Sequence, residues 1–405
     1  MDLKTQSTTQ PSFWSILIVF LRLGLTSFGG PIAHLGYFRE EFVVKRNWLN
    51  DQTYVEIVAL CQFLPGPTSS QVGMVLGFFQ KRYLGLFAAW IGFTLPSAFI
   101  LMVLSILVSA DNQLVPTGMI HGLKIVVVAV VAQAVWAMAK SICTENFKIC
   151  LMTLSTCAVL LFPSLIWTTL AVILISGVVG CIFFKPPAST FQDSYLMKAD
   201  KRVAYASLTL FFVLLLALPF LQELFPSQWL GMLSTFYRAG SLVFGGGHVV
   251  LPLLQSEVIP KDWITSDVFL TGYGLTQAMP GPLFTFAAFI GASAVQSPNG
   301  IWGGMTCLIA IFLPSFLLVL GTLPFWSELK QNTKAKAALS GVNCGVVGIL
   351  LASLYQPIWI SSIATPVDFC FSLVAFVCLV YLKISPWLVV IATSTLFWAS
   401  QLINF

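Results

Sequence analysis

The chain has 405 residues, of which 58% are hydrophobic and only 9% are charged, with a net charge of +5. That much apolar surface exceeds what the core of a soluble protein could bury, so lipid is the expected solvent. The positive charge forms no long basic cluster, which argues against a nucleic-acid partner and points instead to membrane topology. The nine cysteines include no C-x-x-C pair, and we expect neither a metal centre nor a cofactor.

Long apolar segments fill the chain and predict an all-α integral membrane protein. Since about 20 apolar residues span a bilayer, the charge-free stretch from Tyr83 to Ser109 fits one helix, and that from Ile149 to Phe184 fits a hairpin of two. The polar start of the chain predicts no cleaved leader. Thirteen segments follow in order, some of which could instead be re-entrant: 13–36, 54–80, 83–109, 117–139, 148–162, 165–184, 203–222, 230–255, 268–296, 300–326, 339–361, 367–382 and 386–403.

Lys and Arg residues in alternate loops assign the sides of the membrane. With thirteen crossings and a cytoplasmic N-terminus, fourteen basic residues fall inside, and Arg39, Lys45 and Arg46 fall outside. This excess follows the positive-inside rule. We therefore expect a multi-pass protein of the cell inner membrane, with its N-terminus in the cytoplasm and its C-terminus periplasmic or extracellular.

The two halves of the chain match each other at an offset of about 215 residues. The matching motifs are Phe28-Gly29-Gly30 with Phe244-Gly245-Gly246, and Gln62-x-x-Pro65-Gly66-Pro67 with Gln277-x-x-Pro280-Gly281-Pro282. We predict an N-terminal repeat at 1–190, a connector with one helix at 191–229 and a C-terminal repeat at 230–405, with about six helices in each repeat. The single connecting helix inverts the second repeat, an architecture typical of secondary transporters whose site lies near the midplane.

Each Pro-Gly-Pro motif lies near the middle of an apolar segment, where prolines interrupt the helical hydrogen-bond ladder. A new half-helix starting at Pro67 leaves amides free at the positive end of a helix dipole, which suits an anion. A plain proline kink is the alternative, but recurrence after a Gln in both halves favours function. We assign substrate binding to Gln62, Pro65, Gly66, Pro67, Thr68 and Ser69, and to Gln277, Pro280, Gly281 and Pro282.

Two arginines and two glycine pairs complete the predicted substrate site. Arg22 and Arg238 hold matching positions in apolar segments, where a cation is costly unless it meets an anion, water or a carboxylate; snorkelling to the interface is the alternative. The glycine pairs permit a backbone turn around an ion, with close helix packing as the alternative. These pairs are Gly29 with Gly30 and Gly245 with Gly246, and the candidates for coupling or gating are His34, Glu41, Glu56 and Glu257.

The strings FGGPIAHLGYFREEFVVKRNWL and QFLPGP, echoed by FGGGHVVLPLLQSEVIPKDW and QAMPGP, resemble the chromate transporter family in its long, two-domain form. The resemblance covers roughly residues 12 to 360. It implies a secondary transporter that exports chromate, a tetrahedral oxyanion, from the cytoplasm and confers chromate resistance. The second half departs from the family pattern at Gly247, where the first half has Pro31, so binding by both halves is left open.

The expected driving force is the membrane potential or a proton gradient, because the chain has no nucleotide-binding loop. A carrier of sulfate or another oxyanion is the alternative within transport. A membrane-embedded enzyme is disfavoured, since the sequence has only three His and few intramembrane acids. The expected partners are the oxyanion and the lipid bilayer, and a homo-oligomer is left open.

Overall fold

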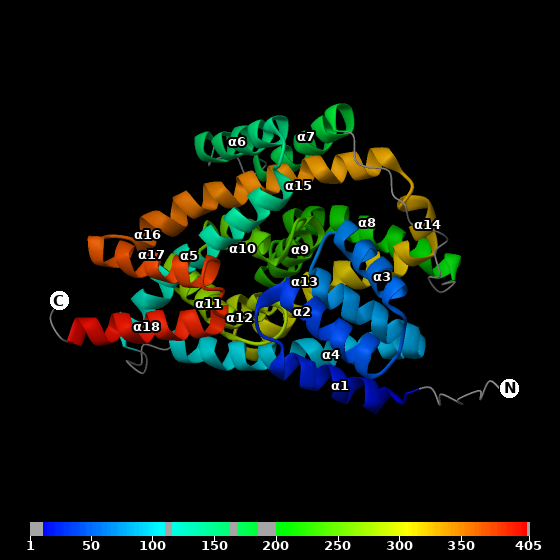
Figure 1. The fold of residues 1–405 in the computed structure, drawn as a ribbon, viewed down its shortest axis with the longest axis horizontal. Helices are drawn as coiled ribbons and strands as arrows, with labels where there is room; N and C mark the ends of the chain where they lie inside the picture. Colours follow the sequence, from blue (N-terminus) through cyan, green and yellow to red (C-terminus); the bar gives the residue numbers. More distant parts are fainter. Residues whose placement is uncertain (1–10, 110–115, 163–167, 185–199, 403–405) are drawn as a thin grey trace.

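The structure is a computed structural model that describes residues 11–109, 116–162, 168–184 and 200–402. Within these ranges the chain is helical and has no β-strand, which confirms the all-α prediction (Figure 1). The first half contains α1 (Phe13–Thr26), α2 (Gly30–Phe38), the π-helical η1 (Arg39–Lys45), α3 (Asp51–Phe63), α4 (Thr68–Ser109), α5 (Thr117–Ile142), α6 (Asn146–Leu161) and α7 (Thr168–Phe183). The helix α8 (Lys201–Leu224) follows as the connector.

The second half repeats this order of elements. It contains α9 (Gln228–Leu242), η2 (Gly247–Val249), α10 (Val250–Val258), α11 (Ser266–Ala278), η3 (Leu283–Thr285), α12 (Phe286–Ala292), α13 (Gly300–Thr322), η4 (Leu323–Phe325), α14 (Trp326–Leu329), α15 (Thr333–Ser353), the π-helical η5 (Leu354–Trp359), α16 (Ile360–Ser362), α17 (Pro366–Val380) and α18 (Pro386–Leu402). The helices therefore break at both predicted Pro-Gly-Pro motifs, between α3 and α4 and between α11 and η3.

Five of the described helices are long and apolar enough to cross a bilayer, as expected of a multi-pass membrane protein. They are Thr68–Val108, Thr117–Ile142, Lys201–Leu224, Gly300–Leu329 and Thr333–Ser362. The share of their most apolar residues that is buried inside the protein ranges from 72% in the α13 region to 17% in α8. The helix α13 therefore lies in the centre of the bundle, whereas α8 turns most of its apolar surface outward.

In the second half, the chain folds back on itself at both glycine-containing breaks. Arg238 of α9 pairs with Glu257 of α10, so these two helices run side by side in opposite directions. Beyond the Pro-Gly-Pro loop, the amide of Val295 donates to the carbonyl of Trp263 at 3.0 Å, which brings the end of α12 back to the start of α11. Both pairs of half-helices are therefore hairpins whose ends lie on one side of the bundle.

The first half folds back in the same way. Phe20 of α1 stacks on Phe42 of η1 at 5.0 Å between ring centroids, so η1 returns along α1. Lys81 and Arg82 have non-helical dihedral angles within α4, which consists of two arms, 68–80 and 83–109. The arms lie antiparallel, because Gly77 packs directly against Gly85. The long segments at 54–80 and 268–296 are thus broken hairpins in the described structure.

The last two helices of each half pack against a helix of the other half. Figure 1 shows α6 and α7 of the first half lying against α15 of the second half, while α17 and α18 of the second half lie against α5 of the first. Gly180 of α7 and Gly341 of α15 meet backbone to backbone, as small residues allow between membrane helices. Because each half supplies the hairpin that covers the other half's central helix, the core is shared by both halves.

Candidate functional site

The two Pro-Gly-Pro loops bind the opposite half of the chain through matching backbone hydrogen bonds. The amide of Gly66 donates to the carbonyl of Val243 at 2.7 Å, and the amide of Gly281 donates to the carbonyl of Ser27 at 3.0 Å. Ser27 and Val243 are equivalent, since each directly precedes the Phe-Gly-Gly motif of its half. Each Pro-Gly-Pro loop therefore lies against the glycine loop of the other half.

Glycine is required in the middle of both Pro-Gly-Pro motifs. Gly66 has φ of 115° and Gly281 has φ of 95°, in the left-handed region that L side chains rarely adopt. A β-carbon on Gly66 would lie 2.7 Å from Ser315 Oγ, and one on Gly281 would lie 2.8 Å from Ser97 Oγ. Since Ser97 and Ser315 each belong to the opposite half, these glycines allow the two halves to cross at close range.

A cavity of about 230 Å³ lies beside this crossing point and is walled by both halves. At about 30 Å³ for each water, its volume holds on the order of seven waters, which is ample for a five-atom oxyanion. Six of the predicted binding residues line it: Gly29, Gly30, Gly245, Gly246, Gln277 and Gly281. The remaining lining residues are Pro31, Ile32, Val130, Gln133, Ala134, Ala137, Met138, Gly247, His248, Thr276, Met279, Leu283 and Pro386.

The glycine loops give the cavity a polar backbone surface. Gly29 and Gly30 have φ of 103° and 76°, and Gly245 and Gly246 have φ of 78° and 131°. Successive amides in turns of this kind form concave surfaces that bind anions. The first loop leads directly into α2, whose N-terminus begins at Gly30. Pro31 and Gly247, the position at which the halves differ, pack against each other across the cavity.

One side-chain donor in the cavity lacks a well-formed hydrogen bond. The Nε2 atom of Gln277 is buried and makes no hydrogen bond of standard geometry to the described residues, although its amide lies beside the hydroxyl of Tyr273, one turn earlier on α11. A buried donor left unpaired costs about 1–3 kcal/mol, which an oxygen of a bound ligand would recover. Gln277 is the penultimate residue of α11, just before the second Pro-Gly-Pro loop.

The first Pro-Gly-Pro loop lies outside the cavity. Gln62, its predicted ligand, is exposed, and Pro65 is held by Gln71, whose Nε2 donates to the Pro65 carbonyl at 2.6 Å. The hydroxyl of Ser69 contacts His34 Nδ1 at 3.3 Å. The predicted ligands Gln62, Pro65, Gly66, Pro67, Thr68, Ser69, Pro280 and Pro282 do not line the cavity. Two loops that match in sequence are therefore unequal in surroundings.

Neither predicted arginine lines the cavity. Arg22 is exposed on α1, and Arg238 pairs with Glu257, which also binds Lys261 at 3.1 Å. In the first half, Glu41 instead binds Arg46 at 2.7 Å. Glu41 and Glu257 therefore take part in ion pairs at the open ends of their hairpins, on the side away from the central crossing.

The two other predicted coupling residues are buried. His34 is 1% exposed, and its Nε2 contacts the carbonyl of Ser27 at 3.1 Å. Glu56 of α3 lies 3.6 Å from the ammonium of Lys330, which follows α14, and both side chains are almost fully buried. The pair joins the first half to the second across the bundle.

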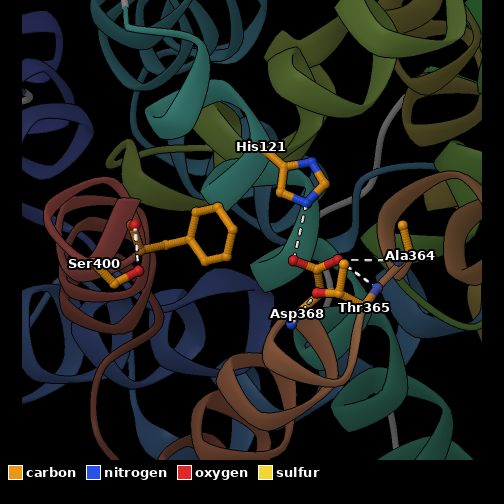
Figure 2. A network of polar contacts seen from close by, with 6 residues as sticks. His121, Ala364, Thr365, Asp368 and Ser400 are labelled. Atoms are coloured by element: carbon orange, nitrogen blue, oxygen red, sulfur yellow. Dashed lines mark hydrogen bonds and ion pairs between the residues drawn. The ribbon is translucent and has the colours of Figure 1, made fainter. Parts of the chain in front are cut away.

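A further network that the sequence did not suggest holds the N-terminal part of α5. His121 Nε2 contacts the carboxylate of Asp368 at 3.1 Å, and Figure 2 shows Asp368 between His121 and the backbone amides of Ala364 and Thr365. One turn on, Lys124 binds Asp267 of α11 at 2.9 Å. Asp368 was missed because its partner is 247 residues away. The capping pattern Thr365-x-x-Asp368 is the only local signal it carries.

Gln133, Thr276 and His248 also line the cavity and were not predicted as ligands. Gln133 and Ala137 are four residues apart and therefore share one face of α5, and Thr276 lies on α11. The sequence alone does not show that these positions face the glycine loops, because that depends on the packing of α5 against α11. Among the described residues, no group of three or more His, Cys, Asp or Glu side chains gathers that could hold a metal ion.

The chromate transporter family model matches the chain twice, over residues 14–181 and 230–398. The chain belongs to the chromate transporter family. It is 28% identical to the chromate transport protein of Pseudomonas aeruginosa, over 87% of this chain and 83% of that protein. Similar proteins also include an uncharacterized transporter of Methanocaldococcus jannaschii, 28% identical over 86% and 85% of the two chains, and a probable chromate transport protein of Synechococcus elongatus, 26% identical over 83% and 82%. No solved structure matches the chain.

Membership of this family supports a transport role for chromate and points to a transporter and not to an enzyme. It also identifies the apolar helices as those of a multi-pass membrane protein. The family implies an oxyanion substrate, which agrees with a cavity lined by amide donors.

Proposed function

We propose that this protein is a secondary transporter that binds chromate in the cavity between the two glycine loops and exports it from the cytoplasm. The observation that carries the proposal is the convergence of matching Phe-Gly-Gly loops from both halves on one cavity. Chromate is a compact tetrahedral dianion, and backbone amides together with the side-chain amide of Gln277 suit its oxygens. Such transport is expected to confer chromate resistance.

The arrangement of the helices supports opposite orientations for the two repeats, with boundaries near 1–190, 191–229 and 230–405. On this proposal the four hairpins α1 with α2, α3 with the 68–80 arm, α9 with α10 and α11 with α12 are re-entrant. Nine described segments then cross the membrane: the 83–109 arm, α5, α6, α7, α8, α13, α15, α17 and α18. The first two hairpins enter from one side and the last two from the other, because an odd number of crossings separates them.

The positive charges favour nine crossings over thirteen. With a cytoplasmic N-terminus, the hairpin loop that carries Arg39, Lys45 and Arg46 moves to the inside, and Lys261 is left outside. Arg22, Lys124 and Arg238 lie within helices and are not counted on either side, as in the count for thirteen crossings. The sixteen inside residues are Lys4, Arg39, Lys45, Arg46, Lys81, Arg82, Lys140, Lys148, Lys185, Lys198, Lys201, Arg202, Lys330, Lys334, Lys336 and Lys383. Sixteen against one is a stronger positive-inside bias than fourteen against three, and the C-terminus remains outside.

The position of the cavity along α5 supports loading from the cytoplasm. Its lining on α5 runs from Val130 to Met138, toward the end of α5 that the proposed topology places inside, and includes Pro386 at the start of α18. The outer end of α5 is fastened by the ion pairs of His121 and Lys124. An inside-negative potential then favours outward movement of a dianion by about 2.3 kcal/mol per charge per 100 mV.

Two glycine variants test the cavity as the substrate site. A β-carbon on Gly246 meets no atom within 4 Å, so Gly246→Ala adds a methyl group to the cavity and strains φ of 131°. Gly300→Ala is the matched control, because Gly300 also has a positive φ, of 54°, and open space, but lies outside the cavity at the start of α13. In inverted membrane vesicles, we expect Gly246→Ala to lose chromate uptake by about tenfold or more while Gly300→Ala retains it.

The same vesicles compare chromate with sulfate, with the potential set in either direction. Equal loss of transport in both glycine variants would mean that backbone strain, and not the cavity, explains the defect. Transport of sulfate but not of chromate by the unmodified protein would assign it to another oxyanion.

A further inference from the structure

The cavity between the glycine loops contains one histidine, whose imidazole can take up a proton. Its lining consists of glycine, apolar residues, the amides of Gln133 and Gln277, the hydroxyl of Thr276 and the imidazole of His248. No lysine, arginine, aspartate or glutamate of the described chain lines it. A dianion that enters this space would therefore meet dipoles but no permanent positive charge.

The ring of His248 is held by one nitrogen and leaves the other free. Its Nδ1 contacts the hydroxyl of Tyr273 at 2.8 Å, and Tyr273 is fully buried on α11. No hydrogen bond within the described residues reaches Nε2, although the residue lines the cavity. A tyrosine hydroxyl both donates and accepts, so it can serve the neutral ring and the protonated ring. Nε2 is then available to donate to a ligand oxygen.

Nearby elements bring no competing charge to the ring. The elements packed against η2 are α10, α15 and η3, and η3 carries no titratable residue. On α10, Glu257 is bound by Arg238 and Lys261, and on α15 the residues that approach the glycine loop are Asn343 and Val346, neither of which is charged. The charged residues on the other elements around the cavity are Lys124 and Lys140 of α5, Asp267 of α11, and Lys334 and Lys336 near the start of α15.

We propose that His248 takes up a proton when the oxyanion binds, so that the loaded site holds the anion together with one proton. This inference rests on the proposed function, since it concerns the same cavity. A buried cation without a partner is costly, so the empty site favours the neutral ring, whereas a bound dianion stabilises the imidazolium. Because linkage is reciprocal, the proton strengthens anion binding by the same factor by which the anion strengthens proton binding.

His34, the histidine that follows the glycine loop of the first half, does not align with His248 and is occupied on both nitrogens. Its Nδ1 contacts Ser69 Oγ at 3.3 Å and its Nε2 contacts the Ser27 carbonyl at 3.1 Å. The residue is buried away from the cavity. The two halves therefore use their histidines differently, and His34 provides a matched control.

Binding of chromate to the purified full-length protein tests the proposal. Equilibrium dialysis gives the affinity between about pH 6 and pH 8, and calorimetry in two buffers of different ionisation enthalpy counts the protons taken up. Chromate itself gains a proton near neutral pH, so the comparison between variants at each pH carries the test. We expect His248→Gln to bind about tenfold more weakly at pH 6 and to take up about one proton fewer than the unmodified protein.

Two further variants separate charge from structure. His248→Lys keeps a permanent cation, so it should bind chromate without the linked proton, while His34→Gln should keep the proton uptake even if less protein is recovered. If His248→Gln takes up as many protons as the unmodified protein, the proposal is overturned while the proposed function stands. If the unmodified protein binds neither chromate nor sulfate at any pH, the proposed function fails as well.

Discussion

Removing either member of the buried pair formed by Glu56 and Lys330 should loosen the contact between the two halves. The carboxylate and the ammonium lie 3.6 Å apart, with exposed side-chain fractions of 3% and 6%. At that distance their attraction is about 5 kcal/mol for an effective dielectric constant of about 20. Since a single substitution leaves the other charge buried, Glu56→Met or Lys330→Met should each destabilise by about 3–5 kcal/mol.

The double variant Glu56→Met with Lys330→Met should recover most of this loss, because it removes both charges of the pair together. The assay is the fraction of detergent-purified protein that stays monodisperse after heating. If each kcal/mol moves the midpoint by roughly 1–2 °C in a chain of this size, either single variant should fall by about 5 °C. Arg39→Met is the control, since its pair with Asp51 is more than half exposed and should change the midpoint little.

A double variant that loses the sum of the two single losses would refute the reasoning, because independent effects would mean that the two side chains do not interact. Single variants as stable as the unmodified protein would show that the pair does not hold the halves together.

Three other predictions follow from the fold. In a cysteine-free background, Lys45→Cys should react with an impermeant maleimide only from the cytoplasm, and Gln296→Cys only from outside. Labelling of Lys45→Cys from outside would instead support thirteen crossings. Gly281→Ala should lower the thermal midpoint. Adding Ser97→Ala should recover part of the loss, because it removes the hydroxyl 2.8 Å from the new β-carbon but leaves the backbone strain of about 1–2 kcal/mol and the contact with the Phe93 carbonyl at 3.2 Å. Arg22→Ala should export chromate within about twofold of the unmodified protein, because its exposed side chain does not line the cavity; a complete loss of export would return Arg22 to the substrate site.

The sequence alone determined that lipid surrounds the protein, which segments are helical, and where Pro-Gly-Pro motifs interrupt the helices. Apolar segments long enough to span a bilayer can be recognised directly in the sequence, because the hydrophobicity of each residue does not depend on its tertiary contacts. Proline and glycine act locally as well, so the ends of α3 and α11 at their Pro-Gly-Pro motifs were predictable. The hairpin at 149–184 also follows from the sequence and agrees with α6 and α7, although its turn at 163–167 lies outside the described residues.

The direction of the chain after each break was decided only by tertiary structure. A broken helix can continue across the membrane or turn back, and the choice depends on contacts such as that of Val295 with Trp263 and that of Phe20 with Phe42. The partners of the charged residues depend on the same packing. Arg238 is paired with Glu257 because α10 returns along α9, while His248 lines the cavity because η2 packs against α15 and η3. Sequence motifs locate such residues along one chain, but a site shared by two halves exists only where the helices of both meet.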